Sequence, residues 1–288
     1  MNTNKIVRTI GDVKSLQRTS QPLQKAIRGL IPGEIKNFLH GTWLGHPLHP
    51  ALTDIPVGAW TAALVLDAIE NLSGAEECGK AADLAIGVGL IGAAGAAVTG
   101  MTDWSETDEP GRCIGLVHGA MNVIATSLYT ASWILRKRRR SRDSGVALSM
   151  LGYATALASA YLGGHLVYGE QIGVDHTATA DQKKPKSFTR AMKVEELKKN
   201  KPARAVVDGV AVLLVKHGDQ IHALTETCPH LGGPLSEGKI VGDAIECPWH
   251  GSQLALDSGR VVNGPTTFPA RCFDVRVRAG YIEVRARV

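Results

Sequence analysis

Four long apolar runs constrain this sequence more than any other feature, because each is long enough to cross a bilayer as a helix. They lie at about residues 52–72 and 84–102, between Arg112 and Arg136, and between Asp143 and Glu170. The last three carry no charge inside their limits, whereas the first contains Asp54 and Asp67 near its ends. A membrane-spanning helix needs about 20 residues. Buried core helices are the alternative, but four such runs in series predict four membrane-spanning helices.

The residues within and between these runs fit the same prediction. Gly92, Ala96 and Gly100 place a small residue at every fourth position, which lets helices approach closely in lipid. A basic hairpin at residues 136–142 joins the third run to the fourth. The net charge of +5 lies in short stretches beside apolar segments. This pattern favours a membrane surface, and the sequence contains no nucleic-acid-binding motif.

Two short segments near the C-terminus each combine a cysteine with a histidine. They read C-P-H-L-G-G from residue 228 and C-P-W-H-G-S from residue 247. The candidate metal ligands are Cys228, His230, Cys247 and His250. Two thiolates and two imidazoles form the ligand set of a [2Fe–2S] centre in which two His replace two Cys on one iron. A Cys2His2 zinc site is the alternative, but zinc fingers group Cys with Cys and His with His. The mixed segments therefore favour the binuclear cluster.

Residues 190–288 resemble a Rieske domain of the ferredoxin type, similar to those that serve bacterial ring-hydroxylating oxygenases. The resemblance rests on C-P-H-L-G-G-P-L-S-E-G from 228, C-P-W-H-G-S from 247, D-S-G-R-V-V-N-G-P from 257 and V-R-V-R-A-G-Y-I-E-V from 275. It implies that Cys228 and Cys247 hold the inner iron, while the two histidines hold the outer, more exposed iron. The surroundings of the cluster are expected to include Ser252, Pro248 and Gly251.

This sequence departs from the high-potential respiratory Rieske proteins at three positions. Those proteins carry an extra cysteine in each segment and join the two in a disulfide, whereas Gly233 and Trp249 stand at those positions here. Ser252 matches a serine that hydrogen-bonds a cluster sulfur, but Leu254 replaces a nearby tyrosine. Hydrogen bonds to the sulfurs raise the potential, so we expect it in the lower half of the roughly −150 to +300 mV Rieske span.

The composition predicts an α+β protein in which a four-helix membrane bundle precedes a small all-β domain. The expected segments are an amphipathic stretch at 1–40, the membrane domain at 41–170, a linker at 171–189 and the Rieske domain at 190–288. Apolar residues at 22–39 recur at helical spacing, broken by Pro32-Gly33, which is typical of helices lying on a bilayer or packed on the protein. Alternating runs with close turns after the linker predict an antiparallel β-sandwich or barrel, with both cluster loops at one tip.

The motif H46-P-L-H49-P resembles the signature of an uncharacterised bacterial family of four-helix membrane proteins, which implies no activity. Chain order places four histidines at one membrane face: His46, His49, His118 and His165. Bis-His ligation of a haem b between helices is the leading hypothesis, because glycines beside His118 and His165 leave room for its ring. The alternatives are a mononuclear metal site that adds Asp54 or Asp103, and hydrogen-bonded histidines without a cofactor.

The function that these features favour is membrane-anchored electron transfer, in which the cluster exchanges electrons with a haem, metal or quinone at the membrane domain. The alternatives are an oxygenase-type oxidoreductase component and a tethered redox sensor whose helices serve only as an anchor. Whether the chain is itself an enzyme stays open. Membrane lipid is an expected partner, and the redox partner is a quinone, a reductase or a cytochrome.

The expected location is a bacterial inner membrane, which the chain crosses several times. The basic hairpin at 136–142 lies opposite the histidine face and indicates that this face is outside. Lysines and arginines that flank the histidine face indicate the reverse. No signal for export of a folded domain is evident, so we expect the Rieske domain on the cytoplasmic side.

Overall fold

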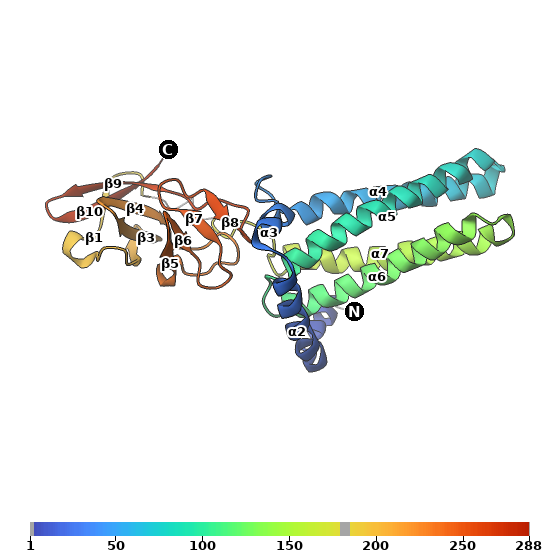
Figure 1. The fold of residues 1–288 in the computed structure, drawn as a ribbon, viewed down its shortest axis with the longest axis horizontal. Helices are drawn as coiled ribbons and strands as arrows, with labels where there is room; N and C mark the ends of the chain where they lie inside the picture. The colour runs from blue at the N-terminus through green and yellow to red at the C-terminus, as the bar shows by residue number, and fades with distance from the viewer. Residues whose placement is uncertain (1–2, 179–184, 288) are drawn as a thin grey trace. The chain divides into compact units, whose positions relative to one another are not determined.

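The computed structural model describes residues 3–178 and 185–287, which form two compact units (Figure 1). The helical unit contains Met1–Pro32 and Leu48–Glu170, and the β unit contains Gly33–Pro47 and Gln171–Val288. The chain therefore passes between the two units three times. Part of the predicted linker, residues 179–184, lies outside the described residues.

Within the described residues, six α-helices and the short 3-10 helix η1 (Arg139–Ser141) build the helical unit. The α-helices are α1 (Thr3–Gly11), α2 (Lys14–Leu30), α4 (Leu48–Ser73), α5 (Glu76–Trp104), α6 (Gly111–Arg136) and α7 (Arg142–Tyr168). The last four are long and apolar enough to cross a membrane, as the sequence predicts. They run side by side in Figure 1, with α2 crossing one end of the bundle.

Small residues let α5 approach α4 closely. A Cβ atom at Gly89 would lie 2.2 Å from Nε1 of Trp60, and one at Gly92 would lie 2.5 Å from a methyl carbon of Ile55. A Cβ atom at Gly100 would lie 2.7 Å from the ring of His49. Helices in lipid gain little from apolar burial, so such close packing is what holds them together.

A network of charged side chains joins α4, α5, α6 and α7 near the basic hairpin. Nη1 of Arg136 on α6 donates to Asp67 on α4 at 2.6 Å and to Asp83 on α5 at 3.1 Å. Arg142 on α7 bonds Asp83 at 2.9 Å and Glu70 at 2.8 Å. Both Arg136 and Asp67 are buried. Two charges of the hairpin are therefore neutralised inside the protein, which weakens the hairpin as a guide to membrane orientation.

The N-terminal helices pack on the bundle. Val7 of α1 is buried against Ile114 and Leu162. The side-chain amide of Gln24 on α2 donates to the carbonyl oxygens of Trp104 and Thr107, at 3.0 and 2.7 Å. The sequence left open whether residues 22–39 lie on a bilayer or pack on the protein, and α2 packs on the helical bundle.

The β unit contains three antiparallel sheets. The first has the order β1 (Thr189–Lys193), β10 (Tyr281–Ala286), β9 (Phe273–Arg278); the second β2 (Ala203–Val207), β3 (Val210–His217), β4 (Gln220–Thr225); the third β5 (Lys239–Val241), β6 (Ala244–Glu246), β7 (Gln253–Ala255), β8 (Val261–Asn263). Together with the four apolar helices, these sheets confirm the predicted α+β organisation.

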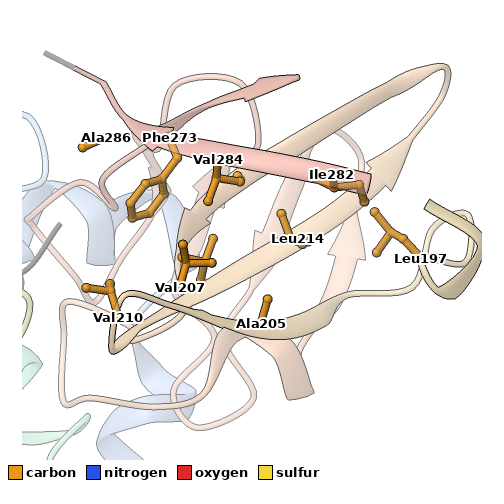
Figure 2. Packing of buried hydrophobic residues seen from close by; sticks show 11 residues of the cluster. Leu197, Ala205, Val207, Val210, Leu214, Phe273, Ile282, Val284 and Ala286 are labelled. Carbon is orange, nitrogen blue, oxygen red and sulfur yellow. The ribbon is translucent and has the colours of Figure 1, made fainter. Parts of the chain in front are cut away.

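Two apolar cores fill the β unit. In the first, Ile282 and Val284 of β10 face Leu214 of β3 and Val207 of β2 (Figure 2). The second core includes Leu213 of β3 and residues of the third sheet, and both Cys228 and Cys247 belong to it. Alternate residues of β3 thus enter the two cores, as a strand between two packed layers requires.

Two segments that adjoin the helical unit in sequence pack on the β unit. In helix α3 (Gly33–His40), Oδ1 of Asn37 accepts a hydrogen bond of 2.8 Å from the Gly264 backbone. The ring of His46 lies edge-on to Phe268, with centroids 5.7 Å apart. The backbone N–H of His176 donates to the Pro229 carbonyl at 3.1 Å. These contacts extend the compact β unit beyond the predicted residues 190–288. Composition could not reveal this extension, because it depends on contacts between segments that are far apart in the sequence.

Candidate metal centre

Two loops of the β unit carry the four candidate ligands, and each loop closes on itself in the same way. In the first, Gly232 N–H donates to the Cys228 carbonyl at 3.0 Å and Cys228 N–H donates to Gly233 at 2.8 Å. The same pair of bonds recurs at Cys247, with lengths of 3.1 and 2.8 Å. Gly232 and Gly251 have φ values of +80° and +75°, which favour glycine. Each loop thus presents one cysteine and one histidine from a tight turn.

The four side chains meet as two like pairs. The thiols of Cys228 and Cys247 are buried and hydrogen-bonded to each other. The rings of His230 and His250 lie 5.0 Å apart at 80°. The buried Nδ1 atom of His230 has no hydrogen-bond partner among the described residues. Buried polar atoms are nearly always satisfied, so this nitrogen fits a metal ligand. Sulfur beside sulfur and nitrogen beside nitrogen is the arrangement that two different irons need.

The surroundings favour the metal-binding protonation state at Cys247 and at His230, whereas they favour the neutral thiol at Cys228. The hydrogen bond from Cys228 lowers the pKa of Cys247 to about 7, with help from the backbone N–H groups of Trp249 and His250. The same thiol pair raises the pKa of Cys228, and burial adds to this effect. Burial, followed by the nearby imidazole of His250, lowers the pKa of His230 to about 3. A thiolate and a neutral imidazole are the forms that coordinate iron.

The two loops pack so closely that position 233 has no room for a side chain larger than that of glycine. A Cβ atom at Gly233 would lie 2.9 Å from Sγ of Cys247 and 3.0 Å from the Trp249 ring. Ser252 is fully buried; its Oγ accepts from Thr266 N–H at 3.1 Å, and its side chain bonds Cys228. All five cysteines are free thiols. The loops therefore come together without the disulfide of the respiratory proteins.

Two further histidines, His40 and His176, lie near this centre. His40 is buried, with 3% of its surface exposed, and both His40 and His176 lie close enough to lower the pKa of His230. His40 is brought there by α3, whose residues pack around Gly264. No local pattern could have linked residue 40 to residue 230, because the contact depends on how distant segments dock.

Two candidate histidines of the helical unit, His49 and His118, come together, with ring centroids 6.5 Å apart. Nδ1 of His49 donates to the Ala96 carbonyl and Nδ1 of His118 to the Ser159 carbonyl, each at 2.8 Å. Each bond fixes the tautomer, because a carbonyl oxygen can only accept. On the other side of the His118 ring, the Asn122 amide lies 3.1 Å from Nε2.

The other two histidines of the predicted set lie elsewhere. Nε2 of His165 is 3.3 Å from a carboxylate oxygen of Glu170, and His46 belongs to the β unit. Within residues 3–178 and 185–287, no three His, Cys, Asp or Glu side chains gather around a single metal position. The mononuclear site with Asp54 or Asp103 is therefore not assembled among these residues.

Comparison with known proteins also finds two successive domains in the chain. Residues 45–176 match the family described as predicted membrane protein (DUF2231), and residues 187–274 match the Rieske [2Fe-2S] domain. The chain is 42% identical to ferredoxin CarAc of Metapseudomonas resinovorans over 77 residues, which are 26% of this chain and 72% of that protein.

Two other similar proteins also match the C-terminal part. The iron-sulfur subunit of the cytochrome b6-f complex of Chlorobaculum tepidum is 34% identical over 73 residues, 25% of this chain and 39% of that protein. The solved ferredoxin of carbazole 1,9a-dioxygenase from Nocardioides aromaticivorans IC177 is 29% identical, covering 35% of this chain and 99% of that chain, with a TM-score of 0.34.

Proposed function

This chain belongs to the Rieske [2Fe-2S] family through its C-terminal domain, and that domain follows a membrane domain of the DUF2231 family; from this premise we propose its function. The proposed function is electron transfer by a [2Fe–2S] cluster that is anchored to a membrane. Its ligands would be Cys228, His230, Cys247 and His250.

One observation carries this proposal: the unpartnered Nδ1 atom of His230 lies buried at the His250 ring. A buried nitrogen without a partner costs on the order of 1–3 kcal/mol, so a metal bond at this atom explains its position. When bound, a Rieske cluster takes up and releases one electron at a time. Both thiols are buried, whereas His230 and His250 are partly exposed, so an electron would leave on the side of the imidazoles.

The ferredoxin type of carrier is supported by the lack of a disulfide between the loops and by Leu254, which is fully buried in the apolar core. A ferredoxin-type carrier would receive electrons from a reductase and pass them to an acceptor. An oxygenase-type component and a tethered redox sensor are the alternatives, and the sensor would use the helices only as an anchor. A quinone or a cytochrome would suit a carrier whose acceptor lies in the same membrane.

Ser252→Ala is expected to lower the reduction potential, because the variant loses a hydrogen bond to Cys228. If the bond favours the reduced state by a typical 0.5–1.5 kcal/mol, the shift is about 20–65 mV for one electron. Redox titration followed by electron paramagnetic resonance measures it. Ser258→Ala on an exposed loop is the control and should leave the potential unchanged. An unchanged potential in Ser252→Ala would mean that this hydroxyl does not influence the cluster.

We further propose that the cluster exchanges electrons with a haem b or a second metal held by His49 and His118, or with a quinone at the membrane domain. Two facts support the histidine pair: the two rings are neighbours, and each Nδ1 is bound to a backbone carbonyl. Ligating histidines commonly donate Nδ1–H to a carbonyl in this way. A ligand at Nε2 of His118 would displace the Asn122 amide.

The pair is tested by a reduced-minus-oxidised visible spectrum and by the metal content of the purified full-length protein. Sharp haem bands, or metal beyond one [2Fe–2S] cluster per chain, are expected in the wild type and absent in His49→Ala/His118→Ala. His165→Ala is the matched control, because Nε2 of His165 lies 3.3 Å from a carboxylate oxygen of Glu170 and its ring is not a neighbour of the His49–His118 pair. If the wild-type protein shows only the broad cluster spectrum and only the iron of one cluster, the histidine pair binds no haem or metal. The membrane domain would then serve a quinone or act only as an anchor.

For the membrane orientation we propose that the Rieske domain faces the cytoplasm. The pairing of Arg136 and Arg142 within the bundle reduces the evidence that the hairpin gives for the opposite orientation. Accessibility of a labelled cysteine at position 190 to a membrane-impermeant reagent, in right-side-out and inverted vesicles, tests this assignment.

A further inference from the structure

An exposed apolar surface lies within residues 33–47, which belong to the β unit. Phe38, Trp43 and Leu44 are 58%, 61% and 44% exposed, and we call them the aromatic foot. The rings of Phe38 and Trp43 are stacked with centroids 5.7 Å apart, and Nε1 of Trp43 donates to the Phe38 carbonyl. The foot is therefore an organised surface of the β unit rather than a set of loose side chains.

The covalent chain places this foot close to a membrane boundary. Trp43 precedes Leu48, the first residue of the membrane-spanning helix α4, by five positions. A fully extended chain spans at most about 3.6 Å per residue, so Trp43 lies within about 18 Å of the helix start. Tryptophan and other aromatic residues at that depth favour the interface between lipid headgroups and acyl chains. A protein partner is not needed to explain the exposed rings.

A cavity of about 570 Å³ adjoins the foot, and its lining suits a phospholipid headgroup. Thr42, Trp43, Arg260 and Thr267 line it, together with Ser258, Val261 and Pro269, and the Thr42 hydroxyl donates to the Asn37 carbonyl. Arginine binds phosphate oxygens in pairs, and hydroxyls can bond the glycerol. Ser258 already donates to the neighbouring carboxylate of Asp257, so Arg260 is the group that would favour an anion.

We propose that the aromatic foot inserts into the bilayer interface and that the cavity beside it holds the headgroup of an anionic phospholipid. The same segment is hydrogen-bonded near the proposed cluster site: Asn37 accepts a bond from the Gly264 N–H, and two residues later the Thr266 N–H donates to Ser252. Lipid contact would thus restrain the loop that carries Ser252. This inference concerns lipid binding and does not depend on the cluster or its redox partner.

The test uses the full-length protein in nanodiscs that contain lipids with brominated acyl chains, which quench nearby tryptophan. The Trp43 fluorescence is the difference between wild type and Trp43→Phe, and it should lose most of its intensity relative to unbrominated discs. At equal mole fraction in phosphatidylcholine, brominated phosphatidylglycerol should quench Trp43 several-fold more than brominated phosphatidylcholine does. Absence of quenching would overturn the interfacial position of the foot.

Two charge variants separate the headgroup site from a general attraction to anionic lipid. Arg260→Gln should make the two brominated lipids quench Trp43 equally. Arg278→Gln removes an exposed arginine at the end of β9 and should retain the several-fold preference of the wild type. A preference that persists in Arg260→Gln, or equal quenching in the wild type, would overturn the headgroup site. Because the readout is Trp43 fluorescence, loss of the cluster in a preparation does not alter its meaning.

Discussion

His250→Ala is expected to abolish the rhombic low-g electron paramagnetic resonance signal of the reduced protein. The variant removes one of two imidazoles that lie 5.0 Å apart, and neither buried thiol can replace a nitrogen on the outer iron. Iron and acid-labile sulfide should fall with the signal, because a cluster that lacks a ligand is open to solvent and loss. Spectra recorded after dithionite reduction measure the effect.

The control for this experiment is His217→Ala. His217 also belongs to the β unit but bonds Asn200 and Asp243 at the end of β3, and the variant should retain the wild-type signal. A wild-type signal in His250→Ala would reject the assignment of this residue as a ligand. A loss of signal in both variants, with a loss of β structure by circular dichroism, would indicate misfolding instead, and His250→Cys would then be the variant to examine.

Arg136→Leu is expected to cost about 3–5 kcal/mol of unfolding free energy, the penalty for breaking a buried ion pair by removing one partner. Asp67 would remain buried on α4 without the guanidinium, and Ser149 would lose its hydrogen bond. The network connects all four membrane-spanning helices, so the loss of Arg136 should weaken the contacts of α6 with α4 and α5. Unfolding by SDS in mixed micelles, followed by circular dichroism, measures the difference.

Two further variants isolate the ion pair from the change in side-chain size. Arg140→Leu in the exposed hairpin should change the unfolding free energy little, because surface charges contribute little to stability. Asp67→Leu/Arg136→Leu should be more stable than Arg136→Leu alone, because no unpaired carboxylate remains at that position. Equal stabilities of Arg136→Leu and Arg140→Leu would show that the network does not stabilise the bundle.

Features that repeat along the chain were open to prediction from sequence. The four apolar runs predicted the number of long helices, because hydrocarbon thickness sets helix length regardless of partners. The break at Pro32-Gly33 separates α2 from α3, as proline after a helix requires. The mixed Cys–His segments indicated a binuclear metal centre, because donor type and spacing already carry that chemistry.

Contacts between distant segments were not open to prediction. The burial of His40 near His230 depends on α3 docking beside Gly264, and residues 33–40 alone read as an ordinary amphipathic stretch. Likewise, chain order gathers four histidines at one face, but helix rotation decides which of them meet. The rotation brings His118 to His49, while His165 pairs with Glu170.

The sequence by itself determined the two classes of structure and the family, because each depends on local composition or on a short motif, and the two Cys–His segments led to the proposed donor set of the metal centre. Only the tertiary structure decided that residues 33–47 belong with the β unit and that Arg136 and Arg142 are paired inside the bundle. It also decided that one buried nitrogen of His230 has no hydrogen-bond partner within residues 3–178 and 185–287. Each of these depends on side chains that meet across long sequence separations. Packing of whole elements chooses among such contacts, and no local pattern of residues encodes that choice.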